Sequence, residues 1–258
     1  MGGVYHFPLR RVKSRYRLNE LNPLILSLRA SKFWYNTDVN PILKRTITGL
    51  AVGVAVIVLI LFAPYAAVAP VVALLALLAI LEFSLLLKKK VGRWTMPTAI
   101  ALIVGAAIIA CGLWTLAEIA YRLGNVMLLY IVAIVKFSDV GGFAVGMSTA
   151  KMMKGGNHKM CPSISPGKSW EGMMGSIAFS CAVSCAFIPA THFAVGKALL
   201  FGVVAAVVGT AGDLVESKFK RWVGVKDSSA LKITNGMGGI LDMLDSLIFA
   251  PAVLLALV

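Results

Sequence analysis

The sequence predicts an all-α fold: a polytopic bundle of about seven to nine transmembrane helices with a polar cavity that faces the cytosol. Of the 258 residues, 59% are hydrophobic and 14% are charged, which is typical of an integral membrane protein. Several apolar runs approach or reach the roughly 20 residues that a helix needs to cross a bilayer. A transmembrane β-barrel is excluded, because its strands would be about 10 residues long with alternating polarity.

The apolar runs give the predicted membrane helices in order. They are 47–63, 66–87, 97–116, 120–137, 172–191, 197–212 and 239–258. Most of the 25 Lys and Arg residues lie in 1–45, 88–93, 151–168 and 218–232, four segments separated by pairs of these helices. Since basic loops stay in the cytoplasm, this distribution predicts that all four segments, and the N-terminus, are cytoplasmic.

Two regions follow from this distribution. Residues 1–45 are predicted to form a basic cytosolic or interfacial segment, and residues 46–258 a membrane-embedded domain. No signal peptide is expected, because the first 45 residues are basic and mixed in character. The net charge of +14 does not indicate a nucleic-acid partner, since the basic residues flank membrane helices and are placed to contact anionic lipid.

Two pairs of carboxylates lie at the ends of the last apolar runs. Asp213 and Glu216 are three residues apart, as are Asp242 and Asp245, so each pair can share one helix face. Facing carboxylates repel each other unless a cation lies between them, and Mg²⁺ prefers oxygen ligands. The pattern favours a metal site over the alternative, in which these are helix-end carboxylates stabilised by the helix dipole.

Candidate phosphate-binding residues lie close to these carboxylates. Lys and Arg side chains bind phosphate, and glycines before a helix let backbone N–H groups approach an anion. The candidates are Ser217, Lys220, Arg221, Lys226, Gly238 and Gly239, and Asp227 beside them is a candidate catalytic residue. The segment 165–172, with Ser165 and Lys168, is predicted to be a basic turn that enters a helix, with Ser169 near the N-cap and Glu171 in the first turn. Asp139 is a further candidate, and the glycines after it indicate close helix packing.

These motifs together resemble the phosphatidate cytidylyltransferase (CDP-diacylglycerol synthase) family. The resemblance covers about 40–258 and rests on Ser-Pro-Gly-Lys-Ser-Trp-Glu-Gly at 165–172, Gly-Asp-Leu at 212–214, Ser217-x-x-Lys220-Arg221-x4-Lys226-Asp227 and Gly238-Gly239-x-x-Asp242-x-x-Asp245. Lys136-x-x-Asp139 also fits. The sequence departs from the family pattern in two places: the His of the family's Pro-x-His-Gly-Gly is missing from 233–239, and Met243 replaces an Arg.

The resemblance implies transfer of a cytidylyl group from CTP to phosphatidate, giving CDP-diacylglycerol and pyrophosphate. It implies a multi-pass membrane enzyme of phospholipid biosynthesis, in a bacterial inner membrane, with its active site on the cytoplasmic side. Mg²⁺, with a second cation left open, would be held by Asp213, Asp242 and Asp245. Lys168, Lys220, Arg221 and Lys226 would bind phosphates, while Asp139 and Asp227 would organise or close the site. A homodimer is left open.

Three alternatives remain at this point. A CTP-dependent polyprenol or phytol kinase of related architecture would release CDP instead of pyrophosphate. An ion-coupled transporter would use intramembrane Asp residues, although the acidic residues here gather at the ends of apolar runs rather than at their centres. An inactive paralogue would retain the carboxylates without turnover.

Overall fold

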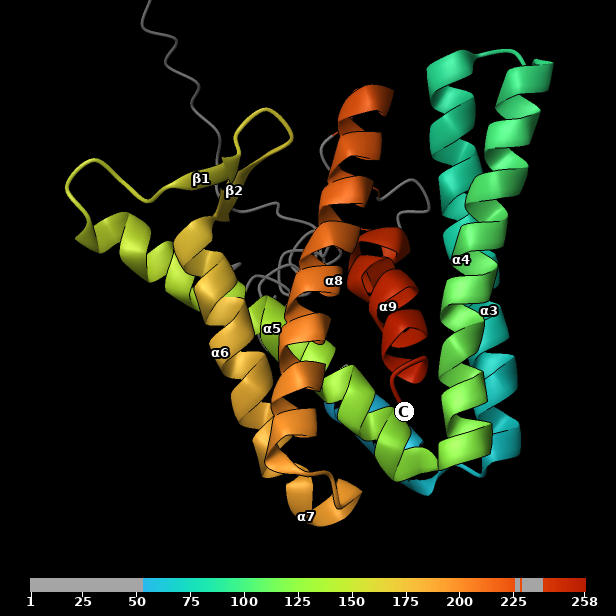
Figure 1. Ribbon diagram of the computed structural model, residues 1–258. Coiled ribbons are helices and arrows are strands. Elements are labelled where there is room, and N and C mark those ends of the chain that lie inside the picture. The colour runs from blue at the N-terminus through green and yellow to red at the C-terminus, as the bar shows by residue number, and fades with distance from the viewer. Residues whose placement is uncertain (1–52, 226–227, 229–238) are drawn as a thin grey trace, which may run out of the picture. The chain divides into compact units, whose positions relative to one another are not determined.

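The computed structural model describes residues 53–225, 228 and 239–258 (Figure 1). The regular secondary structure of these residues is helical apart from one small β-hairpin, which confirms the predicted all-α class. The predicted boundary at residue 45 and the candidate residues Lys226, Asp227 and Gly238 lie outside the described residues.

Four helices in the described part of the chain are long and apolar enough to cross a membrane. They are α3 (Tyr65–Val91), α4 (Met96–Leu123), α5 (Asn125–Met152) and α8 (Val195–Val223). Helices α6 (Trp170–Ala186) and α9 (Ile240–Leu255) are shorter, as is the apolar helix Gly53–Phe62. The chain is therefore a multi-pass membrane protein, and the total of about seven to nine membrane helices stays a prediction.

Two helices extend well beyond the apolar runs that predicted them. Helix α5 continues past residue 137 to Met152, and α8 continues past residue 212 to Val223. An apolar run predicts only the part of a helix that contacts hydrocarbon. The helix can continue past the run, because charged residues such as Glu, Lys and Arg are also good helix formers. As a result, Asp139 and Asp213 lie inside regular helices, each with a fixed direction for its side chain.

The predicted span 172–191 is divided into two helices. Helix α6 ends at Ala186, and the short α7 (Ile188–Thr191) follows after Phe187. Pro189 lies at the start of α7, where its missing N–H and its ring prevent the longer helix from continuing. The single span predicted here is thus wrong in detail.

Helices α5 and α6 pack closely through small residues. A Cβ on Gly141 would lie 2.6 Å from the carbonyl oxygen of Gly175, and a Cβ on Gly142 would lie 2.4 Å from Ser176 Oγ. Only glycine lets the two backbones approach this closely. The prediction that the glycines after Asp139 serve helix packing is confirmed.

A two-stranded hairpin connects α5 to α6. Strand β1 (Lys159–Cys161) pairs antiparallel with β2 (Ser165–Ser169). The segment 165–169 is therefore a strand rather than the predicted turn. The predicted helix start is confirmed, because Ser169 Oγ accepts a hydrogen bond from the Gly172 N–H at 3.1 Å and Glu171 lies in the first turn of α6.

Helix α9 lies between α8 and α4 and packs against both (Figure 1). Its first turn, the C-terminal half of α8 and the hairpin lie toward the same end of the bundle (Figure 1). This arrangement brings together the acidic residues of three helices that are far apart in sequence.

Candidate active site

A polar pocket of about 430 Å³ is formed by α5, α6, α8, α9 and the hairpin. Seven of the candidate residues line it: Asp139, Ser165, Lys168, Asp213, Lys220, Asp242 and Asp245. They come from four different elements, so the pocket is a product of the fold rather than of one local motif.

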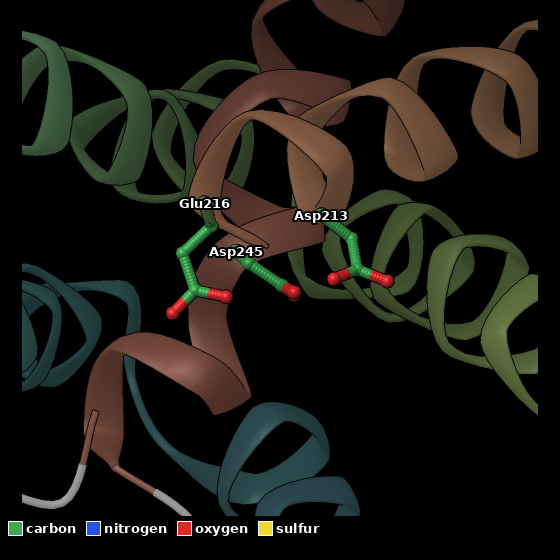
Figure 2. A group of neighbouring side chains, drawn as sticks. All are labelled: Asp213, Glu216 and Asp245. Atoms are coloured by element: carbon green, nitrogen blue, oxygen red, sulfur yellow. The ribbon is translucent and has the colours of Figure 1, made fainter. Parts of the chain in front are cut away.

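Three carboxylates gather at one side of this pocket. One oxygen each from Asp213, Glu216 and Asp245 lies within 4.8 Å of the others, and Figure 2 shows Asp245 between the two acids of α8. Glu216 and Asp245 are buried and Asp213 is half-buried. An all-oxygen group contributed by two helices matches the ligand preference of Mg²⁺.

Lys220 joins two of the acidic residues. Its Nζ lies 2.8 Å from Glu216 Oε2 and 2.7 Å from Asp242 Oδ1. The second oxygen of Asp242 accepts hydrogen bonds from the N–H groups of Gly239, at 2.9 Å, and Ser228, at 3.1 Å. Asp242 therefore fixes the N-terminus of α9 and lines the pocket, but it is not one of the three closely grouped carboxylates.

Lys168 ties the hairpin to α8. Its Nζ lies 2.6 Å from Asp213 Oδ2 and donates to the Thr210 carbonyl oxygen at 3.3 Å. A hairpin side chain thus contacts a carboxylate of the acidic group directly. The lysine predicted to bind phosphate is held at the edge of the site, within reach of an incoming anion.

Asp139 belongs to a small network between α5 and α9. Its Oδ2 accepts a hydrogen bond from Ser246 Oγ at 3.0 Å. Lys136, one turn earlier on α5, donates to Ser246 Oγ at 3.1 Å and to the Met243 carbonyl oxygen at 2.9 Å. These bonds hold the start of α9 against α5, which places Asp245 in the pocket.

Known protein families give a separate comparison. The family model described as "Cytidylyltransferase family" matches residues 102–258, which include every pocket residue named above. The chain belongs to the cytidylyltransferase family.

Relatives of this chain include proteins named phosphatidate cytidylyltransferase. Those of Mycobacterium bovis and Mycobacterium tuberculosis (strain H37Rv) are both 44% identical to it over 115 residues, which are 43% of this chain and 34% and 32% of the relatives. That of Staphylococcus aureus (strain COL) is 43% identical over 124 residues, 47% of this chain and 45% of the relative. The matched stretch thus spans 32% to 45% of the length of these relatives.

Three candidate residues do not line the pocket within the described structure. Ser217 Oγ donates a hydrogen bond to Asp213 Oδ1 at 3.4 Å and so helps to orient that carboxylate. Arg221 donates to the carbonyl oxygens of Ile164 and Val225 and so braces the hairpin. The Gly239 N–H is already bonded to Asp242.

Sequence reasoning left three residues out of the candidate site. Glu216 was placed in a carboxylate pair but not among the metal ligands, and Lys136 was noted only as part of a motif. Glu82, in α3, is buried, and its Oε2 accepts a hydrogen bond from the Leu241 N–H at 2.9 Å. A lone carboxylate within the apolar run 66–87 was the signal available for it, because buried charge is costly in a membrane.

An exposed pair fastens the hairpin to α6. His158 Nδ1 lies 2.6 Å from Glu171 Oε1, and the His158 backbone N–H donates to the same carboxylate at 3.1 Å. Hydrogen bonding from the His158 side chain, aided by backbone N–H groups, lowers the pKa of Glu171 to about 2. Glu171 is therefore ionised at neutral pH and anchors the start of β1 to α6.

Proposed function

We propose that this protein transfers a cytidylyl group from CTP to phosphatidate, giving CDP-diacylglycerol and pyrophosphate. The main support is one observation: in this cytidylyltransferase-family chain Asp213, Glu216 and Asp245 converge beside the polar pocket, where Lys168 pairs with Asp213 and Lys220 pairs with Glu216. The names of the relatives supply the proposed substrates.

The charges around the pocket support the proposal of a bound cation. The described side chains include five carboxylates (Asp139, Asp213, Glu216, Asp242 and Asp245) and three ammonium groups (Lys136, Lys168 and Lys220), so five minus three leaves a formal charge of −2. Two phosphate substrates would add further negative charge. A bound divalent cation offsets the repulsion and stabilises negative charge on phosphoryl oxygens.

Asp213, Glu216 and Asp245 are the residues placed to hold Mg²⁺, because their oxygens already form a compact group. Asp242, expected from the sequence as a ligand, lines the same pocket and stays a prediction in that role. A second cation remains open as well.

The chain's own groups would then act by positioning and by charge. In the proposed reaction a phosphate oxygen of phosphatidate forms a bond to the α-phosphorus of CTP while the bond from that phosphorus to the bridging oxygen breaks, and pyrophosphate leaves. Lys168 and Lys220 would bind phosphate oxygens, and Asp139 would keep α9 in register through Ser246. Such a site needs no covalent intermediate, since orientation and electrostatic stabilisation lower the barrier.

The location of the reaction is part of the proposal. The basic segments favour a cytoplasmic site, and the bacterial relatives favour an inner membrane. Phosphate-binding roles for Ser165, Ser217, Arg221, Lys226, Gly238 and Gly239, an organising role for Asp227 and a homodimer stay predictions.

The direct test is an assay of purified protein with CTP labelled at the α-phosphate, dioleoyl phosphatidate and Mg²⁺. The expected result is labelled CDP-diacylglycerol together with pyrophosphate, both dependent on phosphatidate. Labelled CDP and a phosphorylated polyprenol from a parallel reaction would instead identify a kinase. No turnover with either lipid would contradict both enzymatic functions.

A further inference from the structure

A second cavity lies on the other side of the acidic group. It has a volume of about 340 Å³ and is formed mainly by α4, α8 and α9. Its walls are apolar, with Val104, Gly105 and Ile108 from α4, Val215 and Phe219 from α8, and Phe249 from α9. Among its described lining residues, the ionisable ones are Glu216 and Asp245.

The mouth of this apolar groove opens sideways from the bundle. Val104 and Val215 are 53% and 57% exposed, and Ile108 is 46% exposed. They belong to α4 and α8, two of the helices long enough to cross the membrane, so their exposed side chains contact lipid chains. A ligand that enters here comes from the hydrocarbon and needs an apolar body.

The groove and the polar pocket meet at one residue. Asp245 lines both cavities, and Glu216, which lines the groove, is ion-paired with Lys220, which lines the pocket. A molecule with an anionic head and an apolar chain can therefore occupy both cavities at once. Its head would reach Lys168 and Lys220, while its chain would pass Asp245 toward α4 and α8.

We propose that this groove binds an acyl chain of the phosphatidate substrate; the inference rests on the proposed function and extends it. The aromatic residues on its α3 side define its shape. Phe83 stacks on Phe219 with ring centroids 4.7 Å apart, and a Cβ on Gly105 would lie 2.4 Å from the Phe83 ring. Gly105 thus leaves room for the Phe83 ring, and the ring forms the groove wall nearest α3.

Filling the groove tests this assignment. Ile108→Trp places an indole in the groove, whereas Ile103→Trp adds the same group to an α4 residue that is 68% exposed and does not line it. We expect Ile108→Trp to raise the KM for dioleoyl phosphatidate about tenfold, in line with the penalty for overpacking a filled site. In both variants the KM values for CTP and for dihexanoyl phosphatidate should change by less than about threefold, because neither substrate fills the groove.

The outcomes separate the two proposals. A wild-type protein without transfer activity would contradict the proposed function. An active wild-type protein with the same dioleoyl KM in both tryptophan variants would contradict the acyl-chain groove alone.

A second measurement covers the case in which Ile108→Trp does not fold. Wild-type protein in vesicles is irradiated with a phosphatidate that carries a diazirine in mid-chain, and the labelled peptides are mapped. We expect labelling of 104–108 and 215–219 that excess dioleoyl phosphatidate suppresses and excess dioleoyl phosphatidylcholine does not. Equal suppression by both lipids would show that ordinary bilayer lipid fills the groove and would overturn the proposal.

Discussion

The two cavities share Asp245 but have opposite chemistry. The polar pocket is lined by carboxylates and lysines from α5, α8, α9 and the hairpin, whereas the groove is lined by aliphatic and aromatic side chains of α4, α8 and α9. Helices α8 and α9 contribute to both. Each of these two helices therefore contributes acids to the polar pocket and apolar side chains to the groove.

The contrast shows how a single pair of helices can serve a water-soluble substrate and a lipid. On α8, Asp213 and Val215 lie two residues apart and line different cavities. Helical geometry directs such neighbours to different faces. The predictions below test whether the cavities are as distinct in function as they are in composition.

Changing the residue shared by the two cavities should have the largest effect. Asp245→Asn retains the shape of the side chain but removes a negative charge from the carboxylate group. The proposed cation, which would offset phosphate charge in the transition state, is then held less tightly. We expect turnover to fall by roughly 10³-fold, comparable to loss of one strong electrostatic contact in an active site. Steady-state assays with dioleoyl phosphatidate would measure it.

The matched control is Glu118→Gln on α4, which pairs with Arg122 and lines neither cavity. It should retain wild-type turnover. Asp245→Asn with more than about a tenth of wild-type activity would remove this carboxylate from the proposed site.

Ala substitutions of two lysines that lie two residues apart on α8 should differ sharply in their effect on kcat/KM for CTP. Lys220 is largely buried between Glu216 and Asp242, whereas Lys218 is exposed. We expect Lys220→Ala to lower kcat/KM for CTP by roughly 10- to 100-fold, the range for loss of a charged hydrogen bond. Lys218→Ala should match the wild type. Equal effects of the two substitutions would contradict the proposal that Lys220 binds CTP in the pocket while Lys218 does not.

Added volume at the contact between α5 and α6, which line the polar pocket, should lower the stability of the protein more than the same change at an open site. A Cβ on Gly141 meets the Gly175 carbonyl oxygen and Phe179 Cβ, both at 2.6 Å, and backbone cannot move aside easily. Gly141→Ala should reduce the free energy of unfolding by about 1–3 kcal/mol. Thermal unfolding in detergent would measure it, with Gly196→Ala as control, since nothing lies within 4 Å of a Cβ there. Matching Tm values would contradict the close packing.

The smallest effect concerns the hairpin anchor. The pKa of Glu171 is lowered from 4.5 to about 2, so its contribution is fully present above about pH 4.5 and is lost as pH falls toward 2. The hydrogen-exchange protection factors of residues 158–170, which correct for the intrinsic pH dependence of amide exchange, should therefore fall over this interval in the wild type. Glu171→Gln should exchange faster at pH 5 and lose this pH dependence. An unchanged profile in the variant would show that another group anchors the hairpin.

The sequence predicted most of the polar pocket but little of the groove. Asp139, Asp213, Asp242 and Asp245 stood out because charged residues are rare beside apolar runs. Groove residues such as Ile108 and Val215 gave no such signal, since an isoleucine in a lipid-facing helix has the same local pattern as one that lines a cavity. Only the three-dimensional packing distinguishes them.

Contacts between distant residues were also beyond the sequence. The ion pair of Lys168 with Asp213 depends on a hairpin that was predicted as a turn, and the position of Glu82 beside Leu241 depends on the packing of α3 against α9. Helix ends were misplaced for a related reason: α8 continues through its charged residues, because Glu216 and Lys220 pair one turn apart.

The central claim is that acids of α8 and α9 together hold a divalent cation, and Mn²⁺ binding followed by electron paramagnetic resonance tests it without turnover. In purified protein we expect one tightly bound Mn²⁺, displaced by Mg²⁺, that is lost in Asp213→Asn and also in Asp245→Asn, each alone. If either single variant binds Mn²⁺ as the wild type does, the two helices do not share a metal.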